Sequence, residues 1–244
     1  MQRRHVLRTG AAATAATALS LGTPFPAASA TAPSAGPKRG RTRELRVHTV
    51  LFDDVEEQDF AGPIEVLGIL ANAGNRRIKQ SFVTAEGPRT VRTSSGMHID
   101  VRDPWAPEDA DVLLVPGGGY GKGSGVDDEI KRGVLPRALA RAERPGLIMG
   151  GVCTGVMVLS AAKITRGRPC TTHFAAREDL AEQGGKLTYG RVVDDGDLIT
   201  CGGVTSGLDL ALWLAERLYG PETALRAEMV LEYERRGTVW RADG

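Results

Sequence analysis

Apolar and polar positions alternate along the chain in blocks that predict strands and helices in turn. Short continuous apolar runs are typical of strands buried on both faces of a sheet, and longer runs with helical spacing of apolar residues predict helices. We predict strands over residues 45–52, 78–84, 111–115, 146–149 and 170–172. We predict helices over residues 63–74, 128–142 with an interruption near Pro136, 154–163, 174–183, 206–218 and 221–233.

Two hairpins interrupt this alternation. Residues 90–101 contain a Ser-Gly turn, and residues 187–200 turn at Asp195-Gly196, a pair favoured in tight hairpins. Strands that alternate with helices predict an α/β fold with a mostly parallel central sheet and helices on both faces. The ligand site of such a sheet lies outside the carboxyl ends of its strands, so the candidate chemistry belongs to the turns that follow the buried strands.

Charge and composition limit the possible functions. The 244 residues include 25% charged residues and carry a formal net charge of +1. This balance gives no electrostatic case for nucleic acid or an anionic membrane surface, and outside the N-terminus no apolar run is long enough to span a bilayer. We therefore expect a small-molecule substrate, no nucleic-acid partner and no membrane association once the leader is cleaved.

The N-terminus matches a twin-arginine export signal. Arg3-Arg4 precedes an Ala-rich apolar stretch, and Ala28-Ser29-Ala30 offers a cleavage site. We predict export by the Tat pathway to the periplasm or the exterior. The following segment is rich in Pro, Ser, Gly and basic residues, and is typical of a linker. The predicted organisation is a leader at 1–30, a linker at 31–43 and one folded domain at 44–244.

The turn after the predicted strand at 146–149 carries the clearest chemical pattern. Gly151–Gly155 reads G-x-C-x-G between a strand and a helix, the cysteine counterpart of a nucleophile elbow. The glycines allow a sharp turn that projects Cys153, and the helix N-terminus supplies free N–H groups and a partial positive charge. We predict that Cys153 is a reactive nucleophile with a lowered thiol pKa. The alternative is a buried structural cysteine, while three cysteines do not form a disulfide scaffold.

Two other turns supply candidate partners. The backbone N–H groups of Gly118 and Gly119 could form an oxyanion pocket, or the glycines could form a plain loop. A phosphate loop does not fit, because Lys122 is followed by Gly rather than Ser or Thr. In the acidic loop after the first strand most carboxylates are expected to be solvated. Asp59 could cap the next helix or point towards Cys153.

His173 is the plausible histidine base, at the end of a predicted strand. A Cys-His pair would suit acyl transfer, and a packed structural histidine is an equal alternative. No pair of histidines has metal-ligand spacing, and the two other cysteines are not arranged as a zinc site. We therefore expect neither a metal nor a cofactor.

Several ordered motifs across residues 45–234 resemble the DJ-1/PfpI superfamily of class I glutamine amidotransferase-like proteins, and within it the isocyanide (isonitrile) hydratases. The motifs are VLFDDVEEQDFAGPIEVL, DVLLVPGGG, GGVCTGVMVLSAA, RPCTTH and VVDDGDLITCGGVTSGLDLALWLAERL. The resemblance implies a flavodoxin-like three-layer sandwich, a homodimer and a lyase that adds water to an isocyanide to give an N-formamide. Alternatives are a glyoxalase-, deglycase- or amidase-like enzyme and a non-enzymatic thiol or ligand sensor.

Site residues follow from this resemblance. The nucleophile falls on Cys153, the loop acid on Asp59 and the neighbouring hydroxyl on Thr154. The sequence departs from the hydratase pattern in its export leader and in its early end after the last predicted helix. Phe174 also replaces the Trp usual after Thr-Thr-His, and Cys201 occupies a position often filled by Gly.

Overall fold

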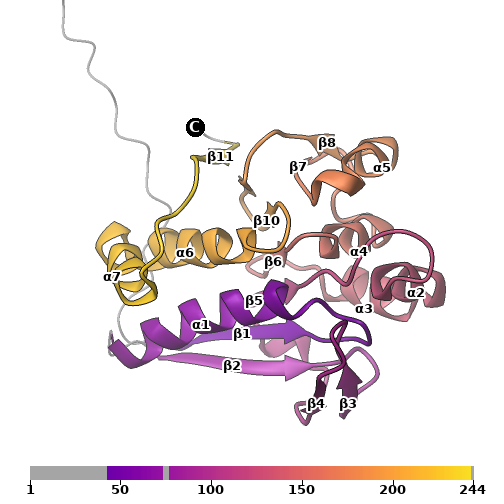
Figure 1. The fold of residues 1–244 in the computed structure, drawn as a ribbon, viewed down its shortest axis with the longest axis horizontal. Coiled ribbons are helices and arrows are strands. Elements are labelled where there is room, and N and C mark those ends of the chain that lie inside the picture. Colours follow the sequence, from indigo (N-terminus) through magenta and orange to yellow (C-terminus); the bar gives the residue numbers. More distant parts are fainter. Residues whose placement is uncertain (1–42, 74–76, 243–244) are drawn as a thin grey trace, which may run out of the picture. The chain divides into compact units, whose positions relative to one another are not determined.

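The computed structural model describes residues 43–73 and 77–242, so the predicted leader and all of the predicted linker except Arg43 lie outside the described residues. Within the described part, a seven-stranded sheet forms the centre (Figure 1). Its strands, in spatial order, are β11 (Val239–Arg241), β9 (Val192–Asp195), β10 (Leu198–Cys201), β6 (Ile148–Gly151), β5 (Val112–Val115), β1 (Leu45–Val50) and β2 (Ile78–Val83).

Neighbouring strands of this sheet pair in parallel, except for the β9–β10 hairpin. In that hairpin Asp195 pairs with Leu198, and Gly196 adopts a φ of 82° in the turn between them. This left-handed conformation suits glycine and matches a tight two-residue turn. The predicted mostly parallel sheet and the predicted hairpin are both confirmed.

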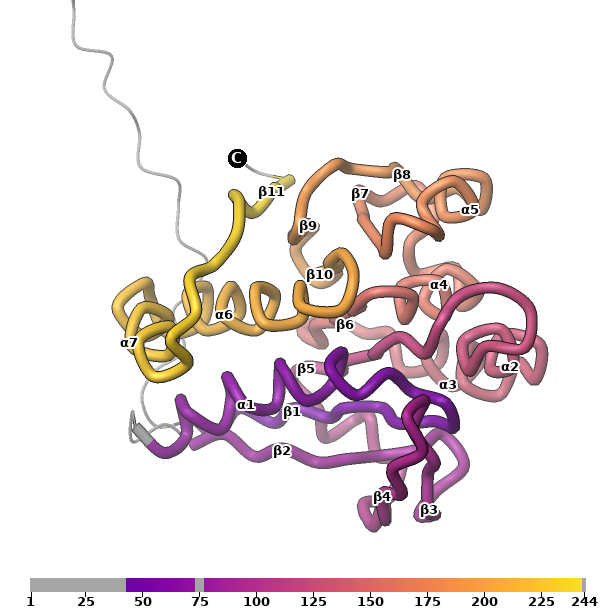
Figure 2. The backbone as a smooth tube through the Cα atoms, in the orientation of Figure 1, coloured from indigo at the N-terminus to yellow at the C-terminus, as the bar shows by residue number. Residues whose placement is uncertain are grey.

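Helices cover both faces of the sheet (Figure 2). One layer contains α1 (Glu57–Ala73), α6 (Ser206–Tyr219) and α7 (Pro221–Leu231), which pack against one another. The other contains α2 (Gly125–Arg132), α3 (Val134–Ala142) and α4 (Gly155–Ala161).

The fully buried strand β5 packs against both helical layers through alternate side chains. Val112 and Leu114 belong to the core cluster of α1, α6 and α7, whereas Leu113 and Val115 belong to the cluster of α2, α3 and α4. Alternate side chains of a strand point to opposite faces, and each fully buried Leu contributes on the order of 2 kcal/mol. The run VLLV is apolar at every position because each face of β5 packs against a helical layer.

Smaller elements lie outside the central sheet and its two main helical layers. They are the hairpin β3 (Arg89–Arg92) with β4 (His98–Val101), the pair β7 (Pro169–Cys170) with β8 (Lys186–Leu187), the 3-10 turns η1 (Pro107–Asp109) and η2 (Phe174–Ala176), and helix α5 (Arg177–Glu182). The β3–β4 hairpin confirms the turn predicted over residues 90–101.

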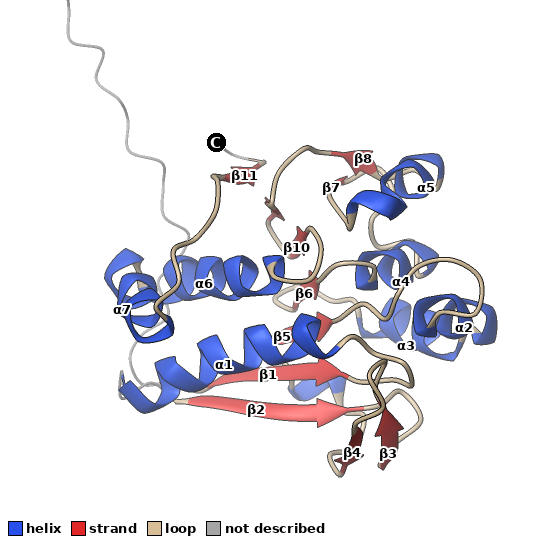
Figure 3. Ribbon diagram, in the orientation of Figure 1, coloured by secondary structure: helices blue, strands red, loops and turns tan. Residues whose placement is uncertain are grey.

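Two local predictions were wrong, and one short strand was not predicted. Helix α1, one continuous helix in Figure 3, begins at Glu57. Pro63 therefore lies inside the helix and not at its first position. The break after α2 falls at Gly133, whose φ is 66°, and not near Pro136, which lies in the first turn of α3. Proline fits a first helical turn, whereas a left-handed residue ends a helix. The edge strand β11 was not predicted, because three residues carry too little pattern.

Candidate active site

Cys153 lies on a sharp turn between β6 and α4. Its φ is 55°, a conformation that a non-glycine residue adopts only when its surroundings impose it. Its N–H donates to the carbonyl of Gly202 at 3.1 Å, and Thr172 Oγ1 donates to the Cys153 carbonyl at 2.7 Å. A Cβ on Gly155 would lie 2.2 Å from the carbonyl oxygen of Val115, so only glycine fits there. The structure therefore has the elbow that the G-x-C-x-G pattern predicted.

Asp59 reaches this elbow from the first turn of α1. It is 1% exposed, and its Oδ2 accepts a hydrogen bond from the N–H of Gly117 at 2.9 Å. The Cys153 thiol interacts with the same carboxyl group, and this hydrogen bond favours the ionised carboxylate. Oδ1 has no well-formed hydrogen bond within the described residues. Asp59 thus points towards Cys153, and it is not the cap that precedes the helix.

Burial dominates the electrostatics of this thiol–carboxyl pair. It raises the pKa of Asp59 to about 7, against the hydrogen bonds from Cys153 and Gly117. It also raises the pKa of the Cys153 thiol to about 12, together with the charge of Asp59. Hydrogen bonds from the backbone N–H groups of Val204 and Thr154 oppose this rise. The predicted lowering of the thiol pKa is therefore wrong, because two amides do not offset desolvation beside a carboxylate.

The glycine loop after β5 contacts the elbow through Thr154. The N–H of Gly118 donates to Thr154 Oγ1 at 3.3 Å, so this amide already has a protein partner. Gly119 follows with a φ of 73°. A Cβ on Gly117 would lie 2.5 Å from Thr154 Oγ1 and 2.6 Å from Asp59 Oδ2. The loop therefore positions the acid and the hydroxyl by close backbone approach.

Sequence reasoning did not single out Val204. Its backbone N–H hydrogen-bonds the Cys153 sulfur, which favours the thiolate. Its φ is 44°, a strained value for a β-branched residue, and its side chain is 38% exposed. Gly202 and Gly203 indicate a turn before Val204, but the sequence does not indicate that the Val204 amide faces Cys153.

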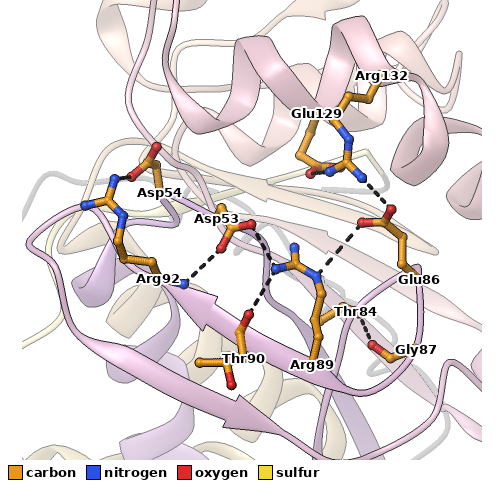
Figure 4. Close-up of polar contacts among 10 residues, drawn as sticks. All are labelled: Asp53, Asp54, Thr84, Glu86, Gly87, Arg89, Thr90, Arg92, Glu129 and Arg132. Carbon is orange, nitrogen blue, oxygen red and sulfur yellow. Dashed lines mark hydrogen bonds and ion pairs between the residues drawn. The ribbon is translucent and has the colours of Figure 1, made fainter.

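The acidic loop before α1 is not simply solvated. Asp53 and Asp54 form ion pairs with Arg89 and Arg92 of β3, at 2.8 and 2.5 Å (Figure 4). The side chain of Glu57 accepts hydrogen bonds from the turn of the β3–β4 hairpin, from Thr93, Ser94 and Ser95. The loop that leads to Asp59 is thereby tied to the hairpin.

His173 stands apart from the thiol–carboxyl pair. Its Nδ1 accepts from the N–H of Ala175 at 3.3 Å, and its ring lies 4.4 Å from that of Phe174. Burial and then the charge of Arg177 lower its pKa. Within the described residues no hydrogen bond joins His173 to Cys153, so the structure does not bring the predicted Cys-His pair together.

The part of the chain described by the structure contains no group of three or more His, Cys, Asp or Glu side chains placed to hold a metal ion. All three cysteines are free and buried. No helix in the described ranges is long and apolar enough to cross a membrane.

Comparisons with known proteins place this arrangement in a family. The model of the DJ-1/PfpI family matches residues 45–217. The chain belongs to the DJ-1/PfpI family. Its fold is accordingly the flavodoxin-like one shared by solved structures of this family, such as a THiJ/PfpI family protein from Pseudomonas syringae. That structure has a TM-score of 0.70 and 26% sequence identity over 84% of each chain.

Two curated relatives indicate the chemistry found in the family. The chain is 34% identical to an isonitrile hydratase of Pseudomonas putida over 192 residues, 78% of each protein. It is 30% identical to a glutathione-independent glyoxalase of Caenorhabditis elegans over 46% of this chain and 57% of the relative. An isonitrile hydratase and a glyoxalase therefore both occur among the relatives of this chain.

Proposed function

We propose that the protein is a cysteine-dependent hydratase that adds water to an isocyanide and releases an N-formamide. The observation that carries the proposal is the buried thiol–carboxyl pair, in which the pKa of Asp59 is raised to about 7 beside Cys153. A carboxyl group with this pKa exchanges protons readily at neutral pH. The similarity to an isonitrile hydratase supports the same reaction.

The first step forms a covalent adduct. Asp59 takes the proton from the Cys153 thiol as the sulfur attacks the terminal carbon of the isocyanide. The same carboxylic acid then delivers this proton to that carbon, which gives an S-linked thioimidate, R–N=CH–S–Cys153. The electron pair from sulfur forms the C–S bond, and no oxidant or reductant is needed. A thiol of high pKa suits this route, because the base beside it removes the proton during attack.

The second step consumes water. Asp59 takes a proton from a water molecule that attacks the thioimidate carbon, and a proton passes to nitrogen. The resulting tetrahedral adduct expels the Cys153 sulfur, which recovers its proton, and the product is R–NH–CHO. The backbone N–H groups of Val204 and Thr154 stabilise negative charge on the sulfur as it leaves. Thr154 Oγ1 holds the glycine loop against the elbow.

Turnover of benzyl isocyanide to N-benzylformamide tests this function. We expect turnover by the domain at 44–244, none by Cys153→Ala, and a loss of about a hundredfold or more by Asp59→Asn. Mass spectrometry of the product is the readout, circular dichroism confirms that each variant is folded, and alkylation of Cys153 in the wild type confirms that the thiol is accessible. A panel of aryl and alkyl isocyanides that yields no formamide, with Cys153 still alkylated, would refute the hydratase.

A glyoxalase-like activity is the second candidate, favoured by the similarity to the glyoxalase of Caenorhabditis elegans. Methylglyoxal turnover with the His173→Ala variant separates the two functions. The hydratase predicts a modest effect of this change, since His173 makes no hydrogen bond to the thiol within the described residues. Near-complete loss of activity in His173→Ala, together with turnover of methylglyoxal, favours the glyoxalase.

We further propose that the protein is exported by the Tat pathway and acts as a homodimer. The paired arginines at positions 3 and 4 support export, and the family resemblance supports the dimer. Replacing both arginines by lysine is expected to retain the precursor in the cytoplasm. Light scattering of the cleaved protein tests the dimer, and a monomeric mass at micromolar concentration would contradict it.

A further inference from the structure

An open hollow of about 570 Å³ lies beside the elbow. Its lining residues are His173, Phe174, Arg177, Tyr189, Gly190, Arg191, Gly202, Gly203, Val204 and Ser206. The segment 202–204 forms a wall that the hollow shares with the nucleophile, because Cys153 donates its N–H to Gly202 and receives a hydrogen bond on sulfur from Val204. This outer hollow therefore lies next to the nucleophile, across residues 202–204.

Aromatic rings are unusually exposed around the outer hollow. The side chains of Phe174 and Tyr189 are 73% and 80% exposed. Two large exposed rings beside one hollow are a typical feature of a binding site for an apolar or flat group. The volume is within the range of small-molecule sites, which is roughly 300–1,000 Å³.

The charge of the outer hollow is positive. No acidic side chain is among its lining residues. The charge of Arg191 is compensated, because its Nε lies 2.5 Å from Asp209 Oδ2 and its Nη2 donates to Thr205 Oγ1. His173, which also lines the outer hollow, is neutral or positively charged and so adds no negative charge.

Arg177 is the cation whose charge is not compensated. Within the described residues its guanidinium group makes no ion pair, and its buried Nε has no hydrogen-bond partner. Its Cζ lies 5.5 Å from the centre of the Tyr189 ring, which orients the guanidinium group beside an aromatic face. A planar guanidinium group binds a carboxylate in two parallel hydrogen bonds.

We propose that the outer hollow binds the substituent of the substrate, and that it selects a flat aromatic substituent carrying a carboxylate, which pairs with Arg177. This inference rests on the proposed function, since it assigns the group attached to the isocyanide nitrogen. The substrate class is then an aryl or arylalkyl isocyanide with a carboxylate at the end remote from the reacting carbon.

Binding of inert ligands tests the subsite independently of catalysis. We expect calorimetry to show that 4-methylbenzoate binds the wild-type protein about tenfold more tightly than its neutral match, 4-methylbenzamide. The Arg177→Gln variant should lose this preference, and Arg226→Gln on α7 should keep it, because Arg226 is exposed and does not line the outer hollow. Equal affinities in the wild type, or a preference unchanged in Arg177→Gln, overturn the inference.

Turnover of a matched pair of isocyanides separates the two proposals. We expect kcat/KM for 4-(isocyanomethyl)benzoate to exceed that for 4-(isocyanomethyl)benzamide about tenfold in the wild type and to equal it in Arg177→Gln. Equal turnover of the pair in the wild type overturns the subsite and leaves the hydratase intact. Failure of both isocyanides, with the binding preference for 4-methylbenzoate retained, refutes the hydratase and leaves the carboxylate site standing.

Discussion

At Cys153 opposing influences act on one sulfur atom. The amides of Thr154 and Val204 favour the thiolate, while burial and the charge of Asp59 favour the thiol. The second pair of effects is larger, so the pKa of the thiol is about 12 and that of the carboxyl group about 7. Near neutral pH the sulfur keeps its proton, and Asp59 is the base that removes it. Activation of this nucleophile therefore depends on its neighbour.

The pH dependence of turnover follows from this division of roles. Asp59 accepts a proton only when ionised, so kcat/KM of the wild type is expected to rise between pH 6 and pH 8, with a midpoint near its pKa of about 7. In the Asp59→Asn variant, kcat/KM should not show this rise. If the pH profile of kcat/KM is the same in Asp59→Asn as in the wild type, the ionisation near pH 7 belongs to a group other than Asp59.

The residues of the site were predictable to different degrees. The elbow at Cys153 is visible because glycines, strand and helix coincide in the sequence. The burial that sets its pKa depends on side chains from α1 and from the loops after β5 and β10, which no local pattern reports. Val204 was missed for the same reason, since the role of its amide arises from a strained turn after β10.

At the scale of elements, the loop between β5 and α2 positions the acid. A methyl group on Gly117 would displace Asp59 Oδ2 and Thr154 Oγ1, which lie 2.6 and 2.5 Å from its Cβ position. We expect Gly117→Ala to reduce kcat/KM at least about a hundredfold, as misplacement of a reacting group does.

The matched control for this change is Gly68→Ala in the middle of α1. There the nearest atom to the added Cβ is Gln80 Nε2 at 3.9 Å, so the methyl group fits. This variant should keep full activity and gain up to about 1 kcal/mol in free energy of unfolding. Equal activities of the two variants would show that the glycine loop does not position the acid.

Helix α1 is tied to the β3–β4 hairpin by Glu57. Burial opposes ionisation of this carboxylate, but hydrogen bonds from Thr93, Ser95 and Ser94 lower its pKa to about 2. Because the folded pKa lies below that of the unfolded chain, the stabilisation is present above about pH 4.5 and is lost as pH falls towards 2.

Glu57→Gln is therefore expected to lower Tm at pH 7, by about the few degrees that loss of roughly 1 kcal/mol causes. The difference from wild type should shrink below pH 4. Glu65→Gln, at an exposed position of the same helix, serves as the control and should leave Tm unchanged. Equal Tm values for Glu57→Gln and the control would show that the hairpin does not depend on this carboxylate.

Element boundaries were the weaker part of the fold prediction. The run starting at Pro63 suggested a helix start, yet α1 extends back to Glu57. The earlier residues fold as helix because Phe60 is buried in the core and Asp59 has a partner in Gly117, which are tertiary contacts. Local preference does not report such contacts.

At the scale of the whole molecule, the alternating pattern was sufficient for the α/β class and the mostly parallel sheet, because β5 and its neighbours are buried on both faces. The edge strand β11 was not predictable, since its three residues pair with β9 without a pattern of their own. The leader and most of the linker lie beyond the described residues, and their prediction stays untested.

Ionisation of the buried Asp59 carboxyl group should lower the free energy of unfolding of the whole domain. The pKa of Asp59 is about 7 in the folded state and ordinarily 3.8, so the folded protein binds a proton more tightly between these values. The free energy of unfolding should therefore fall as pH rises from about 4 to 7, with a slope of at most about 1.4 kcal/mol per pH unit.

Asp59→Asn removes this cost, since the amide oxygen can still accept from Gly117 and carries no charge. Urea unfolding should show the variant to be more stable than wild type at pH 8, with the difference largely gone at pH 4. A variant that is less stable at pH 8 would indicate that ionised Asp59 is well compensated.

The most direct test of the thiol–carboxyl pair is the rate of Cys153 alkylation by iodoacetamide as a function of pH. In the wild type the rate should rise with a midpoint near pH 7, when the pair loses its first proton, and then level off. In Asp59→Asn this rise should be absent, and alkylation should begin only at alkaline pH. A wild-type rate that follows an ordinary thiol pKa of about 8.5, with the same curve in Asp59→Asn, would contradict the account.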